Sequence, residues 1–287
     1  MRQLRSKIIS NIKISGNYHK LIFKENRIAN IIQPGQFLML KVTESKEILL
    51  RRPFSVHRAR GKNIEIIYEV VGRGTEALAH RSKGEYLDII GPLGNGFSYQ
   101  PSHACRQAGA VSYQQPLLIA GGMGIAPLLF LAEKLISRKQ KAESRKPIIL
   151  IGARTRKEIL CESEFKKLGF EVKVSTDDGS KGYKGKVTEL LKTILREPRT
   201  ENQTPTIYAC GPRPMLKEIA RLSRKYKIPA QLSLEEHLAC GIGACLGCVV
   251  KTRTENPVCP AGRRVPRTEY KRVCKDGPVF DAQDLVC

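Results

Sequence analysis

Short apolar runs separated by turn residues fill the first hundred positions of the chain. In the runs at 7–15, 19–24, 36–42, 64–71 and 85–91, apolar and polar positions alternate or β-branched residues follow one another. A period of two, bounded by Gly, Pro and Asn, is typical of β-strands with one buried face. Several short strands at this spacing predict a small antiparallel β-barrel.

A different period begins near residue 116, after a polar and aperiodic stretch at 101–115. Apolar runs at 116–122, 147–153, 171–176 and 206–211 are followed by amphipathic stretches at 126–139, 157–168, 186–195 and 214–226. Strands that alternate with such helices indicate βαβ units and a parallel sheet covered on both faces. The most apolar run, 116–132, is interrupted by glycines and a proline and is shorter than the ~20 residues of a membrane span. We therefore expect no membrane association.

The overall composition describes a basic globular protein. Of the 287 residues, 41% are hydrophobic and 27% are charged, and the formal net charge is +23. The basic excess is scattered and only 6% of residues are aromatic, so a stacking surface for nucleic acid is not expected. A solvated basic surface and an acidic protein partner both remain open. The start MRQLRSKIIS does not resemble a secretory signal, and nine cysteines without one are typical of a reducing compartment, so we expect a cytoplasmic protein.

Four cysteines carry the most specific chemical signal. Cys240, Cys245 and Cys248 follow the C-x4-C-x2-C spacing of plant-type [2Fe–2S] sites, and Cys274 is available as a distant fourth thiolate. Glycines between them allow the loop to fold tightly around a cluster. A structural zinc site is the main alternative, but zinc ligands usually come as two closely spaced pairs and only one such knuckle is present. The pattern predicts an iron–sulfur cluster.

Two motifs in the strand-rich region suit a flavin. RRPFSV offers Arg52 for a pyrophosphate and Phe54 and Ser55 for a ring system. VGRGTEAL places Gly74 and Thr75 at a short helical stretch, where backbone N–H groups bind anions. Taken alone, the first motif could be a strand with a surface arginine and the second an ordinary turn.

The second region carries nucleotide-binding signals. Gly121, Gly122 and Gly124 in GGMGIAP join a buried strand to a helix, as at the first junction of a doubly wound fold. Cys210 and Gly211 end a late strand, where a nicotinamide ring could lie or a small residue could simply precede a turn. TDDGS offers Asp177 and Asp178 to a ribose hydroxyl, or it is only an Asx turn.

In this order the motifs resemble the ferredoxin–NADP reductase superfamily. The tail, EEHLACGIGACLGCVVK with RVCKDGPVFDAQDL, resembles the electron-transfer subunits of bacterial NAD-dependent (class B) dihydroorotate dehydrogenase. The resemblance implies a flavin-binding antiparallel β-barrel at 1–100, a parallel-sheet NAD-binding domain at 116–230 and a small [2Fe–2S] domain at 231–287. The predicted FAD contacts are Arg52, Pro53, Phe54, Ser55, Ile67, Tyr68, Glu69, Gly74 and Thr75. The predicted NAD contacts are Gly121, Gly122, Gly124, Cys210 and Gly211.

The resemblance also implies a redox relay in pyrimidine synthesis. Electrons from dihydroorotate, oxidised on the FMN of a partner catalytic subunit, would pass singly through the cluster to FAD and then as hydride to NAD+. We expect a heterotetramer of two subunits of each kind. No residue of this chain suggests a general base, so the proton chemistry is expected in the partner. A reductase subunit of a sulfide dehydrogenase or of a ferredoxin-linked NAD(P)H oxidoreductase is the alternative.

Three features leave details open. NAD is expected over NADP because Asp177 and Asp178 follow a strand, although Arg154 and Arg156 would favour a 2′-phosphate. The basic stretch at 249–273 is longer than expected and contains an extra cysteine, Cys259. We interpret this stretch as a docking or shielding element, with a solvated loop as the alternative.

Overall fold

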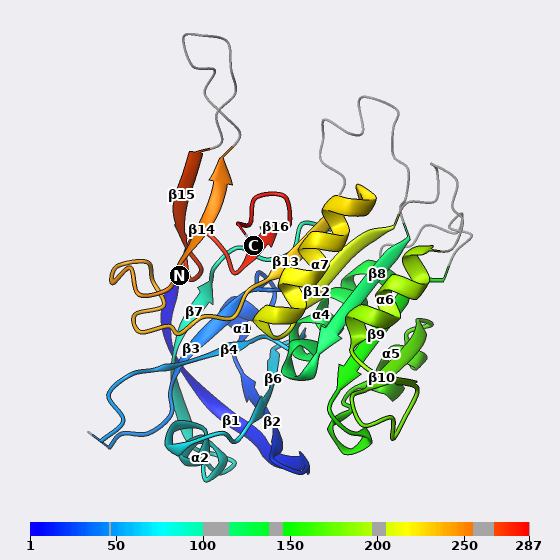
Figure 1. The fold of residues 1–287 in the computed structure, drawn as a ribbon. Helices are drawn as coiled ribbons and strands as arrows, with labels where there is room; N and C mark the ends of the chain where they lie inside the picture. The colour runs from blue at the N-terminus through cyan, green and yellow to red at the C-terminus, as the bar shows by residue number, and fades with distance from the viewer. Residues whose placement is uncertain (46, 100–114, 138–145, 197–204, 255–266, 287) are drawn as a thin grey trace, which may run out of the picture.

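The computed structural model describes residues 1–45, 47–99, 115–137, 146–196, 205–254 and 267–286 (Figure 1). The first of its two large sheets has seven strands in the order β4-β3-β7-β1-β2-β6-β5, and every neighbouring pair in it is antiparallel. Its strands are β1 (Arg2–Ser15), β2 (Tyr18–Lys24), β3 (Phe37–Lys41), β4 (Arg52–Ser55), β5 (Arg58–Arg60), β6 (Asn63–Glu69) and β7 (Tyr86–Leu93). The five predicted strands are confirmed, and the short β4 and β5 are additional.

This sheet curls around a core of its own. Leu21, Phe23, Leu38 and Leu40 are fully buried in that core, each two positions from another inward-facing residue of its strand. Two short helices, α1 (Asn26–Ala29) and α2 (Arg73–Ala79), pack residues into the same core. The antiparallel architecture predicted from the period-two pattern is confirmed.

The second large sheet has the order β11-β10-β9-β8-β12-β13-β16 and is parallel except at β16. Its strands are β8 (Pro116–Gly121), β9 (Ile148–Ala153), β10 (Glu171–Thr176), β11 (Tyr183–Lys184), β12 (Thr206–Cys210), β13 (Ala230–Ser233) and β16 (Val279–Asp281). The helices of this region are α4 (Ile125–Ile136), α5 (Glu162–Lys167), α6 (Val187–Arg196) and α7 (Arg213–Tyr226), with 3-10 turns η1 (Gly122–Gly124) and η2 (Arg156–Glu158).

Helices cover both faces of the parallel sheet, as predicted. Leu117 and Ile119 of β8 face the core under α6 and α7, whereas Leu118 and Ala120 face the core under α4 and α5. The strand is apolar at successive positions because both of its faces are buried.

The predicted helix at 157–168 is wrong in its first half. Residues 156–158 form a 3-10 turn, and Cys161 then adopts a left-handed conformation with φ 60° before α5 begins. A single residue in this conformation breaks the helical hydrogen-bond ladder, so the amphipathic pattern continues across a turn.

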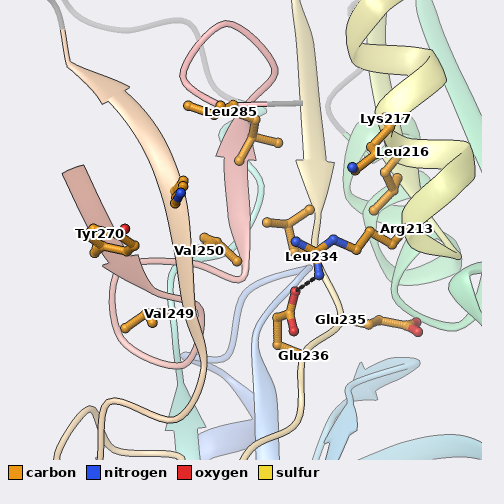
Figure 2. Close-up of a pocket in the computed structure, with 12 residues that line it drawn as sticks. Arg213, Leu216, Lys217, Leu234, Glu235, Glu236, Val249, Val250, Tyr270 and Leu285 are labelled. Carbon is orange, nitrogen blue, oxygen red and sulfur yellow. Dashed lines mark ion pairs between the residues drawn. The ribbon is translucent and has the colours of Figure 1, made fainter. Parts of the chain in front are cut away.

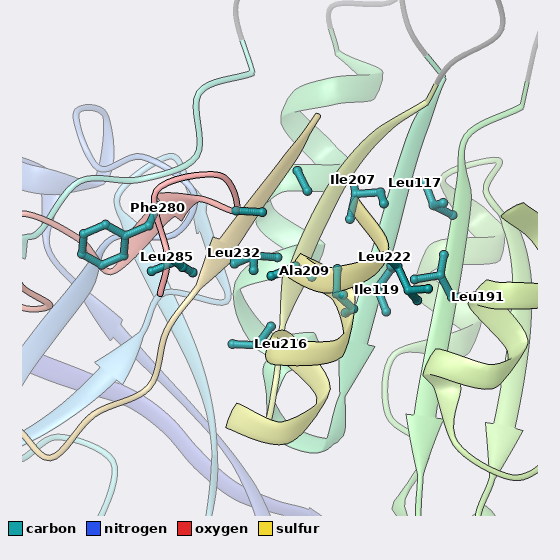
Figure 3. Close-up of a cluster of buried hydrophobic side chains, with 14 of the residues drawn as sticks. Leu117, Ile119, Leu191, Ile207, Ala209, Leu216, Leu222, Leu232, Phe280 and Leu285 are labelled. Atoms are coloured by element: carbon teal, nitrogen blue, oxygen red, sulfur yellow. The ribbon is translucent and has the colours of Figure 1, made fainter. Parts of the chain in front are cut away.

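The C-terminal segment packs onto the parallel sheet. A hairpin of β14 (Val249–Thr254) and β15 (Arg267–Arg272) projects from the body, and β16 then returns to pair antiparallel with β13. Phe280 and Leu285 join the core that Leu216 and Leu232 form under α7 (Figure 3). The exact domain bounds stay a prediction, since β13 and β16 belong to one sheet.

Among the described helices, none has the length and apolar character needed to cross a bilayer. Cys105, Cys259 and Cys287 lie outside the described residues, as do the linker residues 101–114 and the connection 255–266 between β14 and β15.

Candidate functional site

A cavity of about 800 Å³ lies between the antiparallel sheet, the start of α4 and the segment that follows β13. Six of the predicted flavin contacts line it: Pro53, Phe54, Ser55, Ile67, Tyr68 and Glu69. They come from β4 and β6, two strands that the curl of the sheet brings to one side. Its volume lies within the range of about 300–1,000 Å³ that is typical of pockets for small molecules and cofactors.

The aromatic wall of this cavity is held rigidly. The ring of Phe54 meets that of Tyr68 edge to face at 5.7 Å, and the Tyr68 hydroxyl donates to Asn11 Oδ1 at 2.9 Å. Burial raises the pKa of Tyr68 to about 12, so its hydroxyl remains a donor throughout the physiological range. A flat ligand would meet a preformed apolar surface.

Arg52, Gly74 and Thr75, the remaining predicted flavin contacts, lie together beside this cavity. A Cβ placed on Gly74 would stand 2.7 Å from Arg52 Nε, so the arginine side chain lies directly over this glycine. Thr75 Oγ1 accepts from Val71 N at 2.9 Å and fixes the turn that leads into α2. Val71 itself lines the cavity. The Arg52 guanidinium and the start of α2 therefore lie next to this cavity.

A second cavity, of about 750 Å³, lies at the carboxyl ends of β8, β9 and β10. Gly121 and Gly122 line it, as predicted for nucleotide contacts, together with Arg154 and Asp177. Ligands bind at this edge of open α/β sheets, where the loops leave a crevice. Its position fits a dinucleotide that extends from the glycine turn toward β10.

Gly124 and Gly211 act through close packing. A Cβ on Gly124 would come within 2.1 Å of the Cys210 carbonyl oxygen, and one on Gly211 within 2.9 Å of Gly121 N. Gly124 therefore lets the start of α4 approach the end of β12, and Gly211 lets the end of β12 approach the end of β8. The Cys210 side chain is buried and is not among the described residues that line either cavity. Burial raises the pKa of its thiol, which faces the hydroxyl of Ser233. A role for Cys210 beside nicotinamide stays a prediction.

The two large cavities meet at three shared residues: Glu69, Met123 and Glu235 line both. Glu69 ends β6, and Met123 lies in the turn before α4. Ligands that fill the two cavities would come together at this boundary. Such contact is what direct transfer between a flavin and a nicotinamide requires.

A third cavity, of about 300 Å³, adjoins the first (Figure 2). It lies between α7 and the β14–β15 hairpin, and Leu234 and Glu236 line both cavities. The Arg213 guanidinium and the Glu236 carboxylate form an ion pair at 3.5 Å across it. The Glu235 carboxylate points away from this ion pair. Removal of much of its surrounding water raises the pKa of Glu235.

The four predicted cluster ligands form two contacting pairs, Cys240 with Cys245 and Cys248 with Cys274. Cys240 Sγ accepts from Cys245 N at 3.5 Å, and Cys248 Sγ accepts from Cys274 N at 3.5 Å. Within the described ranges, no set of three or more His, Cys, Asp or Glu side chains is gathered at metal-binding distance. Four thiols with backbone N–H donors match the donor set of an iron–sulfur site.

The backbone around the cysteine loop favours thiolates unequally. Burial opposes ionisation of Cys240, but hydrogen bonds from the N–H groups of Cys245 and Ile242 outweigh it and lower the pKa of that thiol to about 6. Burial and the adjacent Cys248 thiol raise the pKa of Cys274 to about 12. The exposed side of the loop thus carries the more acidic thiol.

The cysteine loop packs against the flavin-domain sheet. A Cβ on Gly241 would lie 2.5 Å from Met39 Cγ of β3, so only glycine lets the loop come this close. Leu238 and Val273, which line the first cavity, stand two residues before Cys240 and one before Cys274. The first cavity therefore has the nucleotide cavity on one side and the cysteine loop on the other.

Comparison with known proteins identifies the family. A model of the iron–sulfur cluster binding domain of dihydroorotate dehydrogenase B matches residues 235–286, and a model of the oxidoreductase NAD-binding domain matches residues 118–221. The dihydroorotate dehydrogenase B (NAD+) electron transfer subunit of Caldanaerobacter subterraneus is 35% identical over 284 residues, which cover 99% of this chain and 98% of that protein. The corresponding subunit of Fusobacterium nucleatum is 37% identical over 279 residues, with 96% and 95% covered. The chain belongs to this family.

Solved structures agree with this assignment. A structure of the NADH-dependent reduced ferredoxin–NADP oxidoreductase covers 98% of this chain and 89% of its own, with a TM-score of 0.76 and 26% identity. An Amycolatopsis cytochrome P450 reductase, 19% identical over 79% of this chain and 66% of its own, shares the fold with a TM-score of 0.62. The subunit is thus an oxidoreductase component whose cofactors are FAD, a [2Fe–2S] cluster and NAD.

No sequence motif marked the segment at 234–238 or Val273 as part of the first cavity. The segment ends two residues before Cys240 and Val273 stands one residue before Cys274, and their sequence neighbours gave them no independent signal. Their position beside two strands of the first sheet is a long-range contact, which periodicity along the chain does not contain.

Proposed function

We propose that this subunit carries electrons from dihydroorotate, oxidised on the FMN of a partner catalytic subunit, to NAD+ in pyrimidine biosynthesis. The supporting observation is the order of the three sites. The flavin cavity shares Glu69 and Met123 with the nucleotide cavity, and Val273, next to Cys274, forms part of its other wall. A flavin joins one-electron and two-electron carriers, which is the chemistry needed between a cluster and a nicotinamide.

In this proposal Cys240, Cys245, Cys248 and Cys274 hold the cluster. Arg272 organises the loop around it, because its guanidinium pairs with Asp276 at 3.2 Å and donates to the Gly243 carbonyl at 3.1 Å. Asn95 ties the flavin domain to the same segment through bonds from its side-chain amide to the Lys275 and Asp276 carbonyls at 3.3 and 3.1 Å. These contacts set the separation of cluster and flavin.

The flavin and nucleotide contacts are proposed as predicted. Pro53, Phe54, Ser55, Ile67, Tyr68 and Glu69 would surround the ring system, with Arg52, Gly74 and Thr75 at the pyrophosphate. Gly121 and Gly122 would adjoin the dinucleotide, and Gly124, Cys210 and Gly211 would hold the strand-helix junction behind it. NAD is preferred over NADP. A heterotetramer of two subunits of each kind and a cytoplasmic location stay predictions.

The test is reconstitution with the partner catalytic subunit. Co-expressed subunits should reduce NAD+ with dihydroorotate under anaerobic conditions, while the isolated chain should show only NADH-dependent dye reduction. A Cys274→Ser variant should abolish the dihydroorotate reaction and largely spare NADH-dependent dye reduction, because this proposed cluster ligand does not line the flavin cavity. If reduced ferredoxin, rather than the dihydroorotate-oxidising subunit, supplied electrons to the purified chain, the ferredoxin-linked alternative would replace this proposal.

A further inference from the structure

The nucleotide cavity contains an ion pair at the ends of β9 and β10 that no sequence motif indicates. Arg154 follows β9, and its Nε lies 3.1 Å from Glu158 Oε2. Both residues line the cavity, as does Asp177 at the end of β10. We propose that Glu158 excludes NADP by masking Arg154, and thereby sets the preference of the enzyme for NAD.

Backbone hydrogen bonds join the two loops that carry these groups. Asp177 N donates to the Ala153 carbonyl at 3.1 Å, and Asp178 N donates to the Arg154 carbonyl at 3.2 Å. In parallel-sheet dinucleotide sites, an acidic residue binds the ribose 2′-hydroxyl, whereas a nearby arginine accommodates a 2′-phosphate. Asp177 and Arg154 therefore offer opposite recognition groups to the same part of the ligand.

Asp178 and Arg156 do not compete for this role. The Asp178 carboxylate accepts bonds from Ser180 N at 2.9 Å and from Ser180 Oγ at 2.6 Å, which closes a turn. Arg156 N donates to the same serine hydroxyl at 2.8 Å, and neither residue lines the cavity. The choice between the two dinucleotides falls to Arg154, Glu158 and Asp177.

An exposed ion pair alone would hold Arg154 only weakly, since such pairs contribute little in water. Glu158, however, is anchored by a second contact. Its Oε2 also accepts from Arg154 N at 3.3 Å, and Glu158 N donates to the Thr155 carbonyl at 3.1 Å within η2. The Glu158 side chain is 24% exposed and that of Arg154 is 73% exposed. The carboxylate thus stays in place even when the arginine moves, and its charge would repel a 2′-phosphate.

The neighbouring groups add to this negative field. Tyr18 of β2 lines the same cavity, and burial, followed by the charges of Glu69 and Glu158, raises its pKa. The lining residue Lys192 is paired with Glu218 at 2.8 Å. Lys186, the residue before α6, is a further lining cation, but six acidic residues line the cavity against three basic ones. The field near β9 and β10 therefore favours an uncharged ribose hydroxyl.

The test replaces Glu158 with glutamine, which keeps an oxygen acceptor for Arg154 N and removes the charge. The ratio of kcat/KM for NADPH to that for NADH, measured as dye reduction by the flavin-loaded chain, should rise about tenfold, the value of one charge-assisted contact. In a binding experiment without turnover, the affinity for 2′,5′-ADP relative to 5′-AMP should rise by a similar factor. Glu162→Gln is the matched control, because Glu162 pairs with Lys166 at 2.7 Å outside the cavity lining.

The double variant Arg154→Ala/Glu158→Gln separates masking from general repulsion. Its NADPH to NADH ratio should fall back toward the value of the wild-type chain, because no free guanidinium remains. An unchanged ratio in Glu158→Gln, or an equal rise with and without Arg154, would refute the proposal. The masking proposal rests on the NAD preference proposed above, but different results would refute the two. Faster NADPH oxidation by the wild-type chain would refute that preference itself.

Discussion

The imidazole of His57 lies 2.9 Å from the carbonyl oxygen of Ala126, a contact that joins the antiparallel sheet to the first turn of α4. His57 is fully enclosed, with 1% of its surface exposed. Beside it, Arg58 pairs with Glu133 of the same helix at 2.8 Å, and Arg60 pairs with that carboxylate as well. One neutral ring and two arginines therefore hold the flavin and nucleotide sites in fixed relation.

This buried ring makes stability depend on pH. Burial lowers the pKa of His57 from 6.5 to about 4, so between these values the unfolded chain binds a proton that the folded chain does not. The contribution of the neutral His57 to the free energy of unfolding is fully present above pH 6.5. It is lost as the pH falls toward 4, which lowers the free energy of unfolding by about 3 kcal/mol at most. Urea unfolding of the His57→Asn variant should show a shallower loss of stability across this range than the wild-type chain. The exposed His80, which bonds the Glu76 carbonyl at 2.9 Å, provides the control His80→Asn, with an unchanged pH profile.

The contact between Arg52 and Gly74 predicts how FAD retention responds to substitution. Arg52→Ala should weaken FAD binding about tenfold, because a charge-assisted phosphate contact is lost. Gly74→Ala should also lower retention, since its Cβ would displace the guanidinium from a distance of 2.7 Å. The ratio of flavin to protein absorbance measures both, with the cluster bands unaffected. Arg51→Ala is the control, because that guanidinium pairs with Asp88 at 2.6 Å. Full flavin retention in Arg52→Ala would remove this residue from the site.

The fourth cluster ligand can be assigned by paired substitutions. Cys274 is buried against Cys248, whereas Cys259 lies outside the described residues. Cys274→Ser should abolish or strongly shift the visible and electron paramagnetic resonance signals of the cluster. Cys259→Ser should leave both signals in place. The reverse pattern would move the ligand assignment to Cys259.

Two neighbouring glycines should differ in what they tolerate. Gly124→Ala would place a Cβ 2.1 Å from the Cys210 carbonyl oxygen, a backbone atom that no rotamer change can move. We expect a loss of about 1–3 kcal/mol in unfolding free energy, together with weaker NADH binding. At Gly122, with φ 52°, the space is open, so alanine there should cost only the backbone strain of about 1–2 kcal/mol. Equal stability of Gly124→Ala and the wild-type chain would contradict the close packing.

Local patterns predict the parts of this protein that depend on neighbours in sequence. The period of two gives the strands of the first sheet, and the spacing of Cys240, Cys245 and Cys248 gives the metal chemistry. The contact of Met39 with Gly241 could not be predicted, because nothing in a buried methionine specifies which distant loop it meets. The pairing of Arg154 with Glu158 could not be predicted either. The sequence shows an arginine after the strand, but it does not show whether the guanidinium is free to bind a phosphate or is already paired with a carboxylate.

The return of β16 to the edge of the parallel sheet has a consequence for assembly in the cell. Without it, β13 would be an open sheet edge, and Leu232 would lose the cover of Phe280. Open edges of this kind pair with other chains and aggregate. A chain that ended before Cys274, the fourth proposed cluster ligand, would also lack β16, so it would aggregate instead of remaining as a free flavin reductase that passes electrons from NADH to oxygen. Because β16 follows the cluster cysteines in the sequence and covers the edge of the nucleotide-binding sheet, that sheet is complete only in a chain that also contains the cluster segment.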